Sequence, residues 1–158
     1  MSGWRAYLVA AIALYFAAAA QESIARWTLL GGRVDYLLLV LSVICLYANR
    51  RQGAVFGFFA GWIFGALDGA NLWQYVLSRA LGGYLVAWFA SSGIERGLLT
   101  ALIAGFLGVV ICQTALMFLA PPGSIPHYLG DTIRTAAYNG ALAMLLYACL
   151  NKILGSRR

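Results

Sequence analysis

The chain has 158 residues, of which 63% are hydrophobic and 10% are charged, and its mean hydropathy is +0.81. A soluble domain carries about 25% charged residues, so this composition is typical of an integral membrane protein. The net charge is +6, but the arginines are scattered between apolar runs and do not gather on one face. That distribution is typical of membrane-flanking charges and excludes a nucleic-acid-binding surface.

Six apolar segments predict an all-α, compact bundle of about six transmembrane helices in a single domain, residues 1–158. Their approximate bounds are residues 4–20, 34–48, 53–67, 72–90, 97–120 and 132–154. The second and third each hold about 15 residues, or roughly 22 Å of helix, against a hydrocarbon core of about 30 Å. We therefore expect either snorkelling arginines that extend these spans, or a helix that is tilted, broken or shielded by its neighbours.

The first segment has two interpretations. Arg5, an apolar stretch and the alanine run of residues 17–20 also match a signal peptide, and cleavage after Ala20 would leave five crossings. We favour a retained helix, since a chain with many later spans usually keeps its first one. The alanine run then offers a small-residue face to another helix.

The second segment opens with Asp35, which follows Arg33. An acidic residue in the first turn of a helix is favoured by the helix dipole, and this is the expected role of Asp35. Ser42 lies further along the same segment, where an interhelical hydrogen bond would account for it, as it would for Gln113 in the fifth segment.

The third segment carries five glycines at four-residue intervals: Gly53, Gly57, Gly61, Gly65 and Gly69. Such a spacing places small residues along one slowly winding ridge of a helix. Glycine costs about 1 kcal/mol relative to alanine inside a helix in water, so five of them indicate close approach of another helix in a membrane. We expect this ridge to pack the protein's own core.

Two ionisable residues follow the ridge. Asp68 ends the third segment, and Arg79 lies about two turns into the fourth, roughly 10 Å below the same surface. An ionisable residue inside a membrane span is a candidate functional residue with a partner to be named. We expect Asp68 to pair with Arg79, because the intervening turn places their helices side by side. The pair would fix the hairpin or form part of a site for a ligand or partner.

The end of the chain adds a few polar candidates. Asp131 precedes the sixth segment and is expected to cap it, and Asn139 lies inside it, where an interhelical hydrogen bond is expected. His127, in the preceding proline-containing loop, is expected to be an interfacial residue. Trp4, Trp27, Trp73 and Tyr128 near segment ends are expected to anchor the protein at the membrane interface.

The flanking charges predict an orientation. With a cytoplasmic N-terminus, that side collects Arg5, Arg50, Arg51, Arg96, Lys152, Arg157 and Arg158, whereas the other side has Arg26 and Arg33. This bias favours cytoplasmic N- and C-termini.

No catalytic or metal-binding pattern is present in the sequence. It lacks HExxH, GxSxG and P-loop motifs and paired carboxylates, so we expect neither enzyme activity nor a cofactor. The three cysteines, Cys45, Cys112 and Cys149, all lie in apolar runs without CxxC spacing, and we expect them to be buried packing residues, not metal ligands.

Four motifs together resemble the rod shape-determining protein MreD family. They are VDYLLL at residues 34–39, GFFAGWIFGALD at 57–68, GGYL at 82–85 and YNGALA at 138–143. The family typically has Pro-Asp at the first motif, so Val34 departs from it. The resemblance implies a non-catalytic, multi-pass protein of the bacterial inner membrane. Such a protein would bind MreC and support lateral peptidoglycan synthesis. Through MreC it would associate indirectly with RodA, penicillin-binding protein 2 and MreB. Membrane lipid would surround it.

An alternative function is the substrate-binding subunit of an energy-coupling-factor vitamin transporter, which is also a small six-helix membrane protein of similar architecture. That function requires several polar groups converging near the outer surface. Asp68, Arg79, Asn71 and Gln74, with the proline-rich loop, are the candidates in this sequence.

Overall fold

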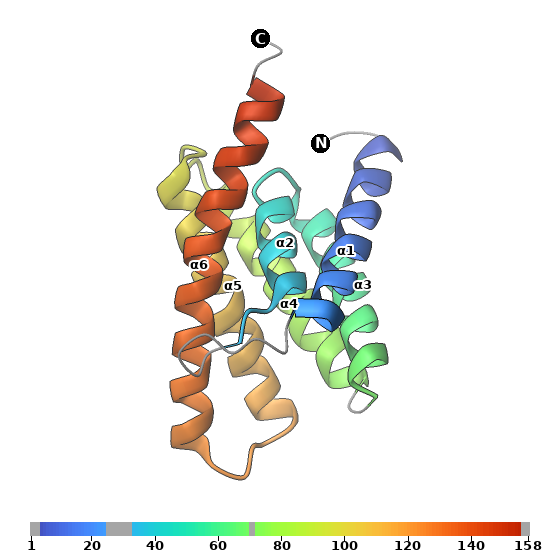
Figure 1. The fold of residues 1–158 in the computed structure, drawn as a ribbon, viewed down its shortest axis with the longest axis vertical. Helices are drawn as coiled ribbons and strands as arrows, with labels where there is room; N and C mark the ends of the chain where they lie inside the picture. The colour runs from blue at the N-terminus through green and yellow to red at the C-terminus, as the bar shows by residue number, and fades with distance from the viewer. Residues whose placement is uncertain (1–3, 25–32, 70–71, 156–158) are drawn as a thin grey trace.

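A computed structural model describes residues 4–24, 33–69 and 72–155 (Figure 1). These residues form six helices and no strand, as the sequence predicts. The helices are α1 (Trp4–Ile24), α2 (Tyr36–Cys45), α3 (Arg50–Asp68), α4 (Leu72–Ser91), α5 (Leu98–Leu119) and α6 (Ile125–Gly155). Arg26, Trp27, Asn71, Arg157 and Arg158 lie outside the described residues.

The start of α1 and the end of α6 lie at the same end of the bundle (Figure 1). The connections α2–α3 and α4–α5 lie at this end as well, since Arg50 contacts Ser91 and the Tyr147 hydroxyl donates to the Arg96 carbonyl. Within the described part of the chain, one helix, Leu98–Leu119, is long and apolar enough by length and composition to cross a membrane.

The central element of the bundle is the short helix α2, which contacts all five other helices. It has 10 residues, and most of its side chains are buried. Of the two short segments discussed above, this one is shielded by its neighbours. The third segment instead gives a 19-residue helix, because α3 begins at Arg50, where Asn49 N donates to Gln52 Oε1 at 3.1 Å.

The glycine ridge of α3 lies against α4, its most extensive partner in the bundle. A Cβ at Gly53 would lie 2.4 Å from the Gly83 carbonyl oxygen, and one at Gly57 would lie 2.1 Å from that of Arg79. At Gly61 the distance to the Tyr75 oxygen would be 2.5 Å. Side chains at these positions would overlap backbone atoms, so the two helices can approach this closely only because the ridge consists of glycine.

The last two glycines differ from each other. Gly65 continues the ridge, since a Cβ there would lie 2.9 Å from Leu72 Cα. Gly69, which we expected to belong to the ridge, is instead the C-cap of α3, with φ 70° and nothing within 4 Å of the position that a Cβ would occupy. Its left-handed backbone conformation, not close packing, explains glycine at this position.

A second close contact joins α5 and α6. A Cβ at Gly105 would lie 2.8 Å from the Asn139 carbonyl oxygen, and one at Gly140 would lie 3.0 Å from that of Leu102. No sequence pattern singles out this pair of glycines, because each lies in a helix with no four-residue glycine repeat. The contact holds α6 against the core and so fixes the position of Asn139.

Three further sequence predictions need correction. Ser42 Oγ donates to the Leu38 carbonyl of its own helix at 2.8 Å, so it makes no interhelical bond there. Cys149 is exposed, whereas Cys45 and Cys112 are buried. Asp131 is not an N-cap, because α6 begins at Ile125 and Asp131 lies within the helix.

Candidate functional site

A buried ion pair between Asp35 and Arg79 lies in the interior of the bundle. Arg79 Nη2 is 2.5 Å from Asp35 Oδ2, and the two side chains are 3% and 8% exposed, respectively. The guanidinium carbon of Arg79 also lies 3.9 Å from the centroid of the Phe64 ring, a cation–π contact. Removal of either charge would leave the other buried and unpaired, which costs several kcal/mol. The pair therefore constrains the packing of α2 against α4.

The two carboxylate oxygens of Asp35 have different partners. Asp35 Oδ1 accepts a hydrogen bond of 2.9 Å from the Leu38 N–H, which makes Asp35 the N-cap of α2. Oδ2 binds Arg79. The predicted role of Asp35 at the start of a helix thus accounts for only one of its two oxygens, and the second joins α2 to α4.

Asn139 connects the same point to α6. Its Oδ1 accepts from the Asp35 N–H at 3.2 Å, and its Nδ2 donates to the Asp35 carbonyl at 2.9 Å. Asn139 is 0% exposed. The Asp35 N–H would otherwise be unsatisfied inside the bundle, whereas the Asp35 carbonyl also accepts from the Leu39 N–H at 2.9 Å. Asp35, Arg79 and Asn139 form a polar cluster that ties together α2, α4 and α6.

The expected pairing of Asp68 with Arg79 is wrong. Asp68 is exposed at the end of α3, and its carboxylate interacts with the Tyr75 hydroxyl. Arg79 lies seven residues after Leu72, about 10 Å deeper along its helix. Helix α2 begins inside the bundle, so Asp35 reaches Arg79 directly and the arginine need not extend toward the surface. Sequence analysis missed this pair because the two residues are separated by 44 positions.

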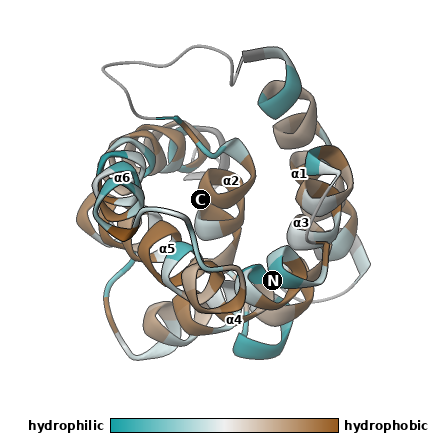
Figure 2. Cartoon of the chain, turned by 90° about the horizontal axis from the view of Figure 1, so that it is seen from below, coloured by the Kyte–Doolittle hydropathy of each residue, from teal (hydrophilic) through white to brown (hydrophobic). Residues whose placement is uncertain are grey.

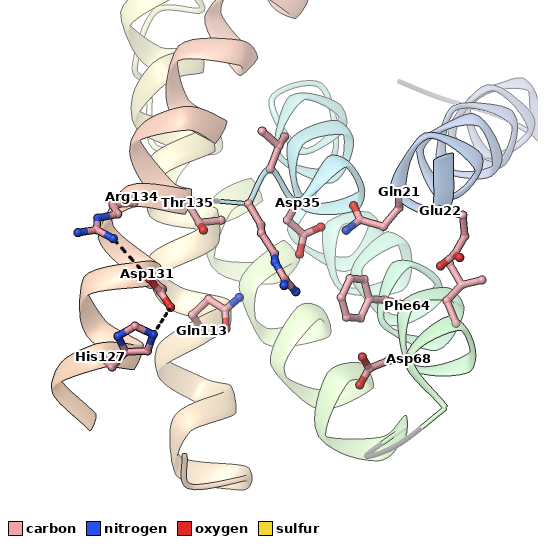
Figure 3. A pocket seen from close by; sticks show the side chains of 13 residues that line it. Gln21, Glu22, Asp35, Phe64, Asp68, Gln113, His127, Asp131, Arg134 and Thr135 are labelled. Atoms are coloured by element: carbon pink, nitrogen blue, oxygen red, sulfur yellow. Dashed lines mark ion pairs between the residues drawn. The ribbon is translucent and has the colours of Figure 1, made fainter. Parts of the chain in front are cut away.

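A cleft of about 880 Å³ opens at the end of the bundle opposite the start of α1 and the end of α6. Figure 3 shows Gln21, Glu22, Phe64 and Asp68 on one side of it, and His127, Asp131, Arg134 and Thr135 on the other. Asp35 lies between them. The complete lining is Gln21, Glu22, Arg33, Val34, Asp35, Phe64, Leu67, Asp68, Gln113, His127, Asp131, Arg134 and Thr135.

The wall formed by α6 is an ion-pair network on the helix surface. His127 Nε2 lies 3.3 Å from Asp131 Oδ2, and Arg134 Nη1 lies 3.8 Å from Asp131 Oδ1 (Figure 3). These residues are spaced by four and three positions, so they share one helical face. The sequence analysis treated His127 as a loop residue. Pro126, near the first turn, was the available signal for an earlier start of α6, since proline is tolerated there.

The residues proposed for a transporter pocket are only partly at the cleft. Asp68 lines it, whereas Arg79 lies behind its wall, in contact with the lining residues Asp35 and Phe64. Gln74 does not line it. The sequence analysis missed most of the lining, including Glu22, because these polar residues come from segments that only the fold brings together.

The chemical groups of the described ranges can be stated directly. No group of three or more His, Cys, Asp or Glu side chains there could hold a metal ion. Asp35 is committed to Arg79 and the α2 cap, and the His127–Asp131 pair has no serine or cysteine nucleophile beside it in the lining of the cleft. The polar cluster behind the cleft joins α2, α4 and α6.

Comparison with known proteins identifies the family. A family model described as rod shape-determining protein MreD matches residues 4–156. The match covers almost the whole chain and confirms the resemblance seen in the four motifs. No curated protein and no solved structure matches the chain.

Proposed function

Because this chain belongs to the rod shape-determining protein MreD family, we propose that it is a non-catalytic membrane adaptor of the bacterial cell-shape machinery. Family membership implies a role in rod shape determination. In this proposal the chain binds MreC and, through it, supports lateral peptidoglycan synthesis by RodA and penicillin-binding protein 2 along MreB filaments. The observation that carries the proposal is the family match over residues 4–156.

We further propose that the chain is a multi-pass protein of the inner membrane with cytoplasmic termini. Its outer surface supports this: large apolar side chains are exposed on several helices and hydrophobic residues occur on all of them (Figure 2). Phe16 on α1 is 67% exposed, Trp62 on α3 53% and Phe118 on α5 76%. Soluble monomers rarely expose apolar area on this scale, whereas lipid chains would cover it.

The buried polar cluster supports an adaptor role in a specific way. Asp35 pairs with Arg79 through its side chain and with Asn139 through its backbone, and these contacts hold α2, α4 and α6 in a fixed relation. A rigid set of helices can present a constant surface to a partner helix, which reduces the ordering cost of association. The cluster is thus structural in this proposal, and partner binding takes place on another face.

We place that face at α2, between α1 and α6. These two helices both contact α2 but not each other, and Figure 2 shows α2 between them. Along α2, the half-buried side chains Tyr36, Val40 and Ile44 repeat every four residues, while the positions between them are buried. This stripe is the side of α2 that its neighbours leave partly uncovered. An apolar transmembrane helix of MreC is the occupant that we propose.

Co-purification tests the adaptor role. Tagged protein is isolated from native membranes in mild detergent, and its partners are identified by mass spectrometry. MreC or the RodA–penicillin-binding protein 2 pair should be recovered. Recovery of a transport ATPase and its membrane subunit without MreC would instead support the transporter alternative and overturn the proposal.

A pair of tryptophan variants tests the proposed face. Val40→Trp enlarges the stripe on α2 and should reduce recovered MreC at least tenfold. Leu77→Trp is the matched control, because Leu77 is 56% exposed on α4, away from α1 and α6. If both variants lose MreC equally, or if neither variant loses it, the proposed binding face on α2 is wrong. Both variants must retain wild-type abundance in the membrane for the comparison to count.

A further inference from the structure

The cleft at the end of the bundle has a separation of charge that an adaptor role does not require. Of the side chains that line it, Glu22 and Asp68 come from α1 and α3. Arg33 lies just before α2, and Arg134 comes from α6. Figure 3 shows Glu22 and Asp68 on one side, across the cleft from Arg134. The α1–α3 side of the cleft is therefore acidic, whereas the α2–α6 side carries Arg33 and Arg134 together with Asp35 and Asp131.

Much of the polar lining is already occupied by internal contacts. Asp35 binds Arg79, Gln21 accepts from the Tyr36 N–H at 2.9 Å, and Gln113 accepts from the Tyr128 hydroxyl. Asp131 interacts with both His127 and Arg134. These contacts fix the walls and reduce the number of groups that remain for a ligand.

Three charges in the cleft have no counter-ion, although one of them, Asp68, also interacts with the Tyr75 hydroxyl. In the described parts of the chain, Glu22, Asp68 and Arg33 form no ion pair. All three are exposed. Their signs are opposite on the two sides, so a ligand with a single charge would satisfy one side and leave the other unpaired. A zwitterion, with an ammonium group and an anionic group, would satisfy both.

The size and composition of the cleft fit a small ligand. Binding pockets for small molecules typically have volumes of about 300–1,000 Å³ and combine apolar walls with a few polar groups. This cleft has a volume of about 880 Å³, and Val34, Phe64 and Leu67 provide apolar lining. Behind it, Arg79 Nη1 is buried with no hydrogen-bond partner among the described residues, while Nη2 of the same guanidinium pairs with Asp35.

We infer that the cleft binds a zwitterionic ligand, with its ammonium group at Glu22 and Asp68 and its anionic group at Arg33. This goes beyond the proposed adaptor function, which needs no ligand. The chemistry is shared by two sources: a free peptide with unmodified ends, and a phospholipid headgroup that carries an amine and a phosphate. Both have the required charges, and the experiment separates them.

The test measures thermal unfolding of the purified chain in nanodiscs of phosphatidylglycerol, a lipid without an ammonium group. Trialanine is titrated as the free zwitterion, and a second sample is prepared in phosphatidylethanolamine nanodiscs. A ligand present at about a hundredfold above its dissociation constant should raise the unfolding midpoint by about 5–10 °C. A rise with trialanine identifies a soluble source, and a rise only in phosphatidylethanolamine identifies the headgroup.

Capped peptides and cleft variants control the result. N-acetyl-trialanine and trialanine amide each lack one charge and should give less than a tenth of the affinity of trialanine. Glu22→Gln and Arg33→Gln should abolish the midpoint rise from either source while leaving the unliganded midpoint unchanged. Arg51→Gln and Glu95→Gln make the same charge changes at exposed positions at the other end of the bundle and should respond as the wild type.

Two results would overturn the inference. One is the absence of a midpoint rise with both saturating trialanine and phosphatidylethanolamine. The other is an equal response to zwitterionic and capped peptides, or equal responses in the wild type and both cleft variants, because recognition would then not depend on separated charges.

Discussion

Removal of the charge on Asp35, with its shape retained, should destabilise the protein strongly. The substitution Asp35→Asn retains an oxygen that can cap α2 through the Leu38 N–H, so the helix start is preserved. It leaves Arg79, 3% exposed, without its carboxylate. Loss of one partner of a buried ion pair costs about 3–5 kcal/mol. For a chain of this length, that corresponds to a fall of about 6–20 °C in the unfolding midpoint.

The complementary changes give a full double-mutant cycle. Arg79→Met removes the other charge and should cost a similar amount, because Asp35 then remains buried without its counter-ion. In the double variant neither charge remains, and replacement of a buried pair by uncharged groups is often close to neutral. We therefore expect the double variant to be more stable than either single variant, with a coupling energy of at least about 2 kcal/mol.

The assay is thermal unfolding of detergent-solubilised protein, followed by size-exclusion recovery and tryptophan fluorescence. Asp131→Asn is the matched control, since it removes an aspartate that contacts a cation at an exposed site. Its cost should be below about 1 kcal/mol. Equal destabilisation by Asp35→Asn and Asp131→Asn, or a double variant as unstable as the sum of the single ones, would refute the argument.

Three further outcomes are expected. Gly57→Ala should lower the unfolding midpoint by at least about 4 °C, because its Cβ would lie 2.1 Å from a carbonyl oxygen of α4. The control Gly123→Ala has open space around the new Cβ and should change the midpoint by less than about 1 °C. Equal midpoints in the two variants would contradict close packing of the ridge. Asn139→Leu should cost about 1–3 kcal/mol in the same unfolding assay, because the buried Asp35 N–H loses its partner while the Asp35 carbonyl keeps the bond from the Leu39 N–H. A neutral effect would show that water replaces the amide. In the folded protein, a maleimide should label Cys149 alone, and the two buried cysteines should react only after denaturation. Intact-mass spectrometry measures the labelling. Equal labelling rates for all three cysteines would contradict the helix packing.

Much of the architecture was predictable from local pattern. Six apolar segments predicted six helices, because hydrophobic runs of this length leave few alternatives to a helix. The four-residue glycine spacing predicted a close helix contact, and four of the five glycines lie at the α3–α4 interface. Four short motifs, of which VDYLLL at residues 34–39 contains Asp35, predicted the family. Each of these signals is confined to a stretch short enough for one helix to contain it.

The functional geometry depended on contacts between distant segments. Asp35 and Arg79 are 44 positions apart, and Asp35 and Asn139 are 104 apart, so no local periodicity joins them. The neighbour in sequence, Asp68, was the natural but wrong partner for Arg79. The choice depended on depth within the bundle: α2 is short and begins in the interior, at the level of the arginine.

The sequence by itself determined the class of protein, the number of helices, the tight α3–α4 contact and the family. These follow from composition and spacing, which act through local propensity and the cost of exposing apolar or backbone groups. Only the tertiary structure decided which charges pair and which remain free at the cleft. A buried charge takes the partner that lies at its own depth, and depth is set by how all six helices pack together, which no single segment specifies.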